Sequence, residues 1–189
     1  MSLLRPAALA ALLLVSIPSL AVAHEGLVHE GCPAGASFTQ GGIIVSGAFT
    51  RAMLPHAQSA GGYFTIANSG TEADTLTGAS SEAATDIGIH QMTMNGQVME
   101  MSAVEDGLPI PAGGSVALTP DGFHLMMTGM PTPFKQGECV ALTLHFAKAG
   151  DLPVLLNIGG VAQATPPGDG GVSVKSSGGM DMSGMSMGQ

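Results

Sequence analysis

The dipeptide Asn95-Gly96 constrains the fold of this chain more than any other feature. It lies within the stretch 86–127, between two segments in which side chains of different kinds alternate. Asn-Gly in that setting is the strongest short-range signal for a β-hairpin closed by a two-residue type I′ turn. A turn also sets the register of its hairpin, so this dipeptide predicts which side chains face each other across the two strands.

The predicted hairpin gathers imidazole and thioether side chains on one face. If residues 95 and 96 form the loop, His90 lies directly opposite Met101. Directly opposed side chains have Cβ atoms about 4.5–5.5 Å apart, close enough to bind one metal ion. Alternation then places one His and four Met on a single face: His90, Met92, Met94, Met99 and Met101.

A second His–Met pair follows in the segment 123–128. His124 and Met126 are two residues apart, so they share one face of an extended segment. On the other face, Phe123, Leu125 and Met127 are expected in the core. His124 and Met126 are therefore expected to face outward, near the rim of the sheet and open to solvent or a partner.

Together the two pairs predict a copper site. A thioether is a soft, neutral donor that suits Cu(I), and imidazole also suits copper, whereas zinc sites normally use Cys, His or carboxylate. The alternative is that methionine fills irregular gaps in the core. That alternative is the better interpretation of a single Met, but not of a Met-rich hairpin face. The predicted Cu(I) ligands are His90, Met101, His124 and Met126.

The remainder of the chain up to residue 158 is typical of an all-β domain. Short apolar or alternating segments are separated by Gly, Pro and Asp turns, and no segment has a long helical period. This spacing predicts an antiparallel sandwich or barrel. His145 lies on the polar face of its segment, so we interpret it as a surface residue. The expected strands are 43–50, 62–68, 74–79, 86–94, 97–104, 115–119, 123–128, 139–147 and 152–158.

The N-terminal segment 1–23 has the features of a secretory signal peptide. Arg5 provides the positive charge, an apolar run follows, and Ala21-Val22-Ala23 matches a cleavage site. The apolar run is too short to span a membrane as a permanent helix. We therefore expect an exported, periplasmic protein with no membrane span after cleavage.

Residues 24–42 are expected to form a flexible arm that contains His24 and His29. After cleavage His24 would have a free α-amino group beside its imidazole, a pair that chelates Cu(II). A disordered polar terminus with incidental histidines is an equally good interpretation.

Residues 159–189 are rich in Gly, Pro and Ser and are expected to be disordered. We interpret their closely spaced thioethers as a second, adaptable Cu(I) site, the alternative being low-complexity drift. These thioethers belong to Met180, Met182, Met185 and Met187.

Charge and cysteine content narrow the function. Acidic residues outnumber basic ones by 14 to 5, so no basic patch is available for nucleic acid. A disulfide between Cys32 and Cys139 suits an exported chain, but it requires Cα atoms within about 7 Å of each other. No Met follows Cys139 and His145 closely, as the ligand loop of a blue-copper electron carrier would require.

The hairpin and its surroundings resemble the periplasmic copper chaperones of the PCuAC family. That family has a His, ten residues, a Met, about twenty-one or twenty-two residues and a His-x-Met; here ten residues separate His90 from Met101, and twenty-two separate Met101 from His124. The segments 61–81, 107–127 and 133–150 are also similar, and the likeness covers residues 43–158.

The resemblance implies a cupredoxin-like Greek-key β-barrel that binds one Cu(I) through the four predicted ligands. It also implies delivery of copper to the copper-A subunit of cytochrome oxidase, commonly alongside a thioredoxin-like copper assembly protein. We expect a monomeric carrier rather than an enzyme, because no nucleophile–base pair stands in a recognisable catalytic setting. Copper storage or detoxification is the alternative, and a cupredoxin electron carrier is a weaker one.

Overall fold

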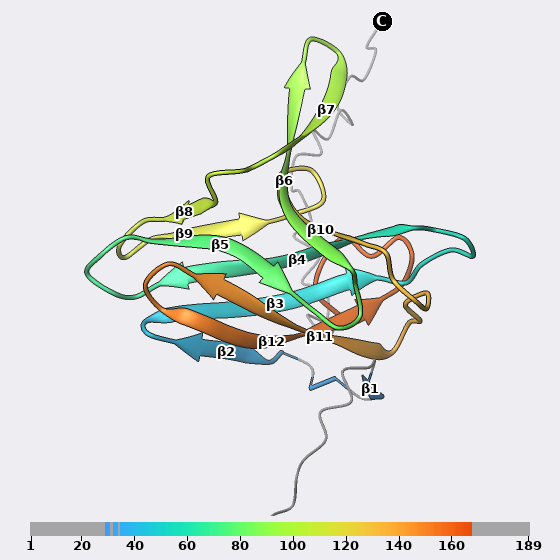
Figure 1. Ribbon diagram of the computed structural model, residues 1–189, viewed down its shortest axis with the longest axis horizontal. Coiled ribbons are helices and arrows are strands. Elements are labelled where there is room, and N and C mark those ends of the chain that lie inside the picture. Colours follow the sequence, from blue (N-terminus) through green and yellow to red (C-terminus); the bar gives the residue numbers. More distant parts are fainter. Residues whose placement is uncertain (1–28, 31, 34, 168–189) are drawn as a thin grey trace, which may run out of the picture.

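The computed structural model describes residues 29–30, 32–33 and 35–167 of the chain (Figure 1). These residues form twelve β-strands and no helix. The expected signal peptide and most of the tail lie outside this range. The strands are β1 (His29–Glu30), β2 (Ser37–Gln40), β3 (Ile43–Arg51), β4 (Ser59–Asn68), β5 (Asp74–Ser80), β6 (Asp86–Asn95), β7 (Val98–Ala103), β8 (Leu108–Ile110), β9 (Ser115–Leu118), β10 (Phe123–Thr128), β11 (Glu138–Phe146) and β12 (Gly150–Gly159).

All the strands belong to one curled sheet. Its order is β7-β6-β10-β9-β4-β3-β12-β11-β5-β8, with β2 attached to β3 and β1 to β11. Most neighbours are antiparallel, but β12 with β3 and β10 with β9 are parallel. The curl brings β5 against β6 and β8 against β4, which encloses a core between the two halves of the sheet. The expected all-β architecture is confirmed.

The nine expected strands are all present, and three short ones were missed. β1, β2 and β8 contain only two, four and three residues. One expectation about the arm is wrong, because residues 37–40 form β2 and pair along β3 from Ser37↔Ser46 to Gln40↔Ile43. Backbone hydrogen bonds to β3 hold this segment in place.

Alternation along the strands explains the core. In β11, Val140, Leu142, Leu144 and Phe146 are buried, while the residues between them are partly exposed. In β10, Leu125 and Met127 are fully buried, and Phe123 packs against the core from its margin. Cys32 and Cys139 form a disulfide with Cα atoms 5.5 Å apart, which fastens the segment before β2 to β11.

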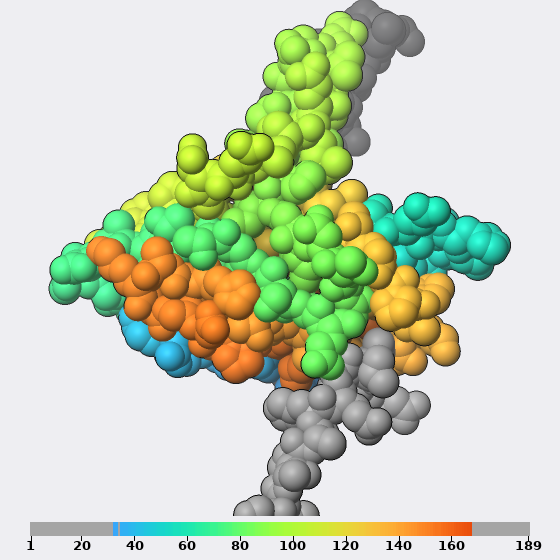
Figure 2. All heavy atoms as spheres, in the orientation of Figure 1, coloured from blue at the N-terminus to red at the C-terminus, as the bar shows by residue number. Residues whose placement is uncertain are grey.

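The β6–β7 hairpin extends beyond the body of the barrel (Figures 1 and 2). Within the described part of the chain, β7 pairs only with β6, and all six of its residues are exposed. Residues 86–91 of β6, by contrast, also pair with β10, so β6 joins the hairpin to the body. The described residues contain no helix long and apolar enough to cross a membrane.

Candidate metal centre

Two histidines far apart in the sequence meet where β6 and β10 pair. His90 of β6 and His124 of β10 are direct partners in the antiparallel register, and their ring centroids are 6.0 Å apart. The two rings are tilted by 47° to each other. Direct pairing puts both side chains on the same face of the sheet, so the two predicted imidazoles do come together.

Met126 joins this face two residues further along β10. Its partner on β6 is Gly88 and its partner on β4 is Gly61. Neither neighbour has a side chain, and the Tyr63 hydroxyl occupies the space over Gly61. A Cβ added at Gly88 would lie 3.1 Å from His90 Nε2. Gly88 therefore leaves space between His90 and Met126 that any other residue would narrow.

The register of the hairpin differs from the one predicted. Asn95 belongs to β6 and pairs with Val98, so the loop is Gly96-Gln97. Of these two loop residues only Gly96 has a positive φ, at 65°. Type I′ requires positive φ at both positions, whereas type II′ requires it at the first, where Gly is preferred. The predicted type I′ turn at Asn95-Gly96 is therefore wrong.

The corrected register changes the partner of His90 but not its face. His90 lies opposite Ala103, and Met101 lies opposite Met92. The partners move by two residues, and side chains alternate with a period of two, so the predicted Met-rich face is preserved. Met101 is thus a diagonal neighbour of His90, at about 7–8 Å rather than about 5 Å.

His124 is more buried than predicted, with 6% of its surface exposed. The expectation that it lies open to solvent is wrong, because β6 on one side and β4 and β9 on the other enclose β10. Its Nδ1 lies 3.1 Å from the carbonyl oxygen of Gly122. Donation from Nδ1–H to that carbonyl leaves the Nε2 lone pair available, the usual arrangement of a histidine that binds metal.

His90 presents an unsatisfied nitrogen. Its Nδ1 is buried and has no hydrogen-bond partner, the one such side-chain atom among the described residues. Leaving a buried polar atom unpaired costs about 1–3 kcal/mol. A metal ion bound by this nitrogen would remove that cost, so the donor set fits a soft cation in a site with no charged ligand.

The four predicted ligands differ in exposure. His124 is buried, His90 and Met126 are partly buried, and Met101 is exposed on the free strand β7. Ligand access therefore increases from β10 towards the hairpin. Met92 lies between His90 and the exposed end, on the same face, and the predicted ligand set omitted it. Its position opposite Met101 depends on the hairpin register, which the sequence did not reveal.

A wall of aromatic side chains lies beside this face. Tyr63 of β4 packs on Phe49 with ring centroids 5.1 Å apart, and the Arg51 guanidinium lies 5.5 Å from the Tyr63 ring centroid. Burial raises the pKa of Tyr63; Arg51 opposes this rise, and Asp121 adds to it. The Tyr63 hydroxyl lies over Gly61, where any Cβ would collide with it. Sequence reasoning missed this aromatic wall, because it depends on β3 and β4 lying side by side.

Other candidate residues lie apart from the centre. His145 is on the surface as predicted, and its nitrogens contact Asp151 at 2.7 Å and Ser80 at 2.9 Å. His56 is exposed in the β3–β4 loop. His29 lies in β1, where it pairs with Cys139 of β11. The remaining terminal candidates lie outside the described residues: His24, Met180, Met182, Met185 and Met187.

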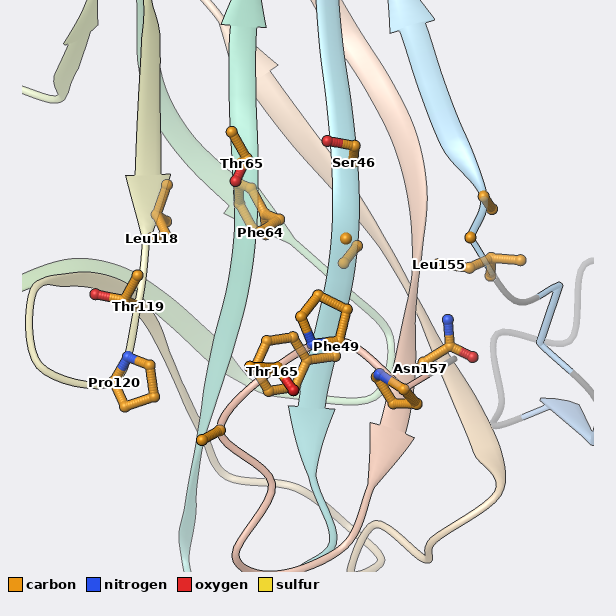
Figure 3. A pocket seen from close by; sticks show the side chains of 17 residues that line it. Ser46, Phe49, Phe64, Thr65, Leu118, Thr119, Pro120, Leu155, Asn157 and Thr165 are labelled. Carbon is orange, nitrogen blue, oxygen red and sulfur yellow. The ribbon is translucent and has the colours of Figure 1, made fainter. Parts of the chain in front are cut away.

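One hollow in the described part of the molecule is lined by none of the four predicted ligands. It measures about 550 Å³ and lies against β3, β4, β9 and β12, where Phe49, Phe64 and Leu118 form its floor (Figure 3). Pro166 contributes to its edge. The described lining has neutral polar groups such as Thr119 and Asn157 but no ionisable side chain.

Comparison with known proteins gives consistent matches. The profile of a family described as "Putative lipoprotein LpqE-like" matches residues 43–158. A protein of Leifsonia xyli subsp. xyli (strain CTCB07), described as "Putative lipoprotein Lxx21020", is 30% identical over 117 residues, which is 62% of this chain and 69% of that protein.

Solved structures agree with the fold. DR1885 from Deinococcus radiodurans, solved with Cu(I), is 29% identical with a TM-score of 0.51, covering 68% of this chain and 80% of that one. The copper-bound PCuAC domain from PmoF2 has a TM-score of 0.57 at 22% identity, covering 66% of this chain and 98% of that domain. The expected cupredoxin-like β fold is confirmed.

Proposed function

This chain belongs to the LpqE-like family, and from that premise we propose that it is an exported carrier of Cu(I). The observation that supports this most directly is the unpartnered, buried Nδ1 of His90 beside the ring of His124. The ligands we propose are His90, Met101, His124 and Met126. The Cu(I)-bound state of DR1885, at 29% identity, supports the choice of metal.

The mechanism we propose is ligand exchange. The bound ion would be held by neutral donors, each of them weak, with the imidazoles at the buried end and Met101 at the exposed end. Donors of a recipient would displace the exposed thioether first and the buried imidazole of His124 last. Copper would pass from one ligand set to the other without release and without change of oxidation state.

A competition titration tests the site. The mature full-length chain is titrated with Cu(I) against a chelator, beside His124→Ala and the matched control His145→Ala on the far surface. Loss of an outer-shell partner costs about 10–100-fold in affinity, so loss of a ligand should cost at least about 100-fold at the tightest site. The control should bind as the natural chain does. Equal affinity for all three proteins would refute the site.

The recipient we propose is the copper-A subunit of cytochrome oxidase, or a thioredoxin-like copper assembly protein, in the periplasm. The "lipoprotein" description of the family and of the Leifsonia relative supports export. Mixing Cu(I)-loaded chain with each purified recipient, followed by separation and copper analysis, tests delivery. Copper that stays with this chain in every mixture would favour storage instead.

We also propose additional copper at the termini, with His24 and His29 suited to Cu(II) and the tail methionines to Cu(I). The test counts the copper bound by the mature chain and by a variant with alanine at His24 and His29 and leucine at the four tail methionines, which keeps β2 and the Cys32–Cys139 disulfide. Equal counts in both oxidation states would refute additional copper at the termini.

A further inference from the structure

We propose that the outer part of the β6–β7 hairpin is itself a Cu(I) site, formed by Met94 and Met99 with Met92, and that it exchanges copper with the inner site. This inference rests on the proposed function and adds an entry and exit point to it. Neither the PCuAC resemblance nor the predicted ligand set includes Met94 or Met99 as ligands.

The register places thioethers opposite each other in two successive pairs. Met94 pairs with Met99 at the tip, and Met92 pairs with Met101 one step below. Directly opposed side chains have Cβ atoms about 4.5–5.5 Å apart, and successive pairs on one face are about 7 Å apart along the strands. A Met side chain is long and flexible enough for an ion between the two pairs to reach three or four sulfur atoms.

The exposure of these residues contradicts a role in packing. Met94, Met99 and Met101 are 67%, 43% and 48% exposed. Among the six large apolar side chains that stand out as exposed in the described chain, these three and Val98 all belong to the hairpin. Core filling requires burial, so the alternative interpretation of the hairpin methionines does not apply to this end.

The hairpin is also two-sided. The face opposite the methionines has polar residues, and Asn95 Nδ2 donates to Glu100 Oε1 at 3.2 Å across the strands. Gln91 and Ser102 pair further down the same polar face. Soft sulfur donors are thus segregated from oxygen donors, which favours a soft ion such as Cu(I) over hard divalent cations on the methionine face.

The outer site leads to the inner one in short steps. From the Met94–Met99 pair the next pair is Met92–Met101, and the His90–His124 pair follows, about 13 Å from the tip along β6. Met101 neighbours both sites, since it is diagonal to His90 on one side and to Met94 on the other. At each step a Cu–S bond breaks as a bond forms from copper to the next sulfur or, at His90 and His124, to an imidazole nitrogen, and copper remains Cu(I) throughout.

The experiment uses the mature full-length chain labelled with ¹³C at its methionine methyl groups. The chain is titrated with Cu(I) without oxygen, and each methyl signal is assigned with single Met→Leu variants, which keep size and apolarity but remove sulfur. Copper transfer to a chelator is then timed for the Met94→Leu/Met99→Leu double variant. Met53→Leu, which removes a sulfur away from the hairpin, is the matched control.

We expect the Met94 and Met99 signals to shift before saturation, after or together with that of Met126. The double variant should keep the tightest Cu(I) but transfer it to the chelator about tenfold more slowly, while the control transfers at the natural rate. Unmoved Met94 and Met99 signals, or an unchanged rate in the double variant, would overturn this inference alone. An unmoved Met126 signal would instead overturn the proposed function.

Discussion

The barrel and the β6–β7 hairpin use the same amino acid in opposite ways. Met127 of β10 is fully buried between the two halves of the sheet, whereas Met94 and Met99 lie at the exposed end of a two-stranded ribbon. The opposite half of the sheet covers Met127, whereas, in the described part of the chain, no layer of sheet covers Met94 or Met99. Methionine therefore contributes packing where the sheet closes and free sulfur where it does not.

The comparison separates stability from function. Closed regions of a fold open only with global unfolding, while a two-stranded ribbon with few buried contacts opens at low cost. β6 belongs to both regions, since Ile89 lies in the core and Met94 lies at the tip. The candidate centre at His90 is located where the two regions meet, next to a stable support and an accessible edge.

The largest expected effect contrasts two methionines. Met127→Ala should lower the free energy of unfolding by about 2–5 kcal/mol, because it leaves a cavity in the core. Met99→Ala should change it by about 0.5 kcal/mol or less, as for other exposed residues. Urea denaturation of both variants measures the difference. Similar losses would show that the hairpin is buried against another surface in solution.

A second test concerns a buried carboxylate at the far end of the barrel. Asp74 accepts backbone hydrogen bonds from Thr75 at 2.7 Å, and from Lys148 and Ala149 at 2.9 Å. Burial by itself would raise the pKa of Asp74, but these three bonds and the Lys148 charge hold it below the ordinary value. Asp74→Asn should cost about 1–3 kcal/mol by leaving a buried N–H without an acceptor.

The pH dependence follows from the lowered pKa. A carboxyl whose pKa is depressed by folding contributes stability above its unfolded pKa of about 4, and that contribution is lost as pH falls through the folded value. The natural chain should therefore lose stability in acid more steeply than Asp74→Asn. Glu72→Gln is the control and should alter the acid profile much less than Asp74→Asn, because the Lys148 ion pair that lowers the pKa of Glu72 is exposed and screened by solvent. Copper affinity should be unchanged in both variants.

The smallest expected effect compares two glycines with matched backbones. Gly96 in the hairpin loop and Gly113 before β9 have φ of 65° and 63°, and a Cβ at either would meet nothing within 4 Å. Alanine with positive φ costs about 1 kcal/mol at each. Gly113→Ala should lower the free energy of unfolding by that amount. Gly96→Ala should leave the global free energy of unfolding nearly unchanged, because the hairpin opens separately from the barrel. The local cost should instead weaken copper binding on the hairpin by up to about fivefold.

Equal losses of stability from the two glycine variants would contradict the separate behaviour of hairpin and barrel. That result would mean that the hairpin unfolds together with the barrel rather than separately. Calorimetry for stability, with the methionine methyl signals for copper, measures both quantities on the same samples.

The positions of the longer strands along the chain, and the buried face of each, were predictable because alternation is a local property. The pattern Val140, Leu142, Leu144, Phe146 specifies a buried face without reference to any other segment. The methionine-rich face of the hairpin was predictable for the same reason, and it survived an error in the turn. A shift of two residues between partners leaves every side chain on its original face.

Tertiary structure decided the rest. Whether Asn95 or Gln97 closes the loop with Gly96 depends on the whole ribbon and on the attachment of β6 to β10, not on the dipeptide alone. The meeting of His90 with His124, the burial of His124, and the glycines beside Met126 result from pairing between distant strands. The sequence by itself determined which donors share a face, because that depends on a period of two. Only the tertiary structure determined which of those donors are close enough to share an ion, because distance between strands depends on how the sheet is assembled.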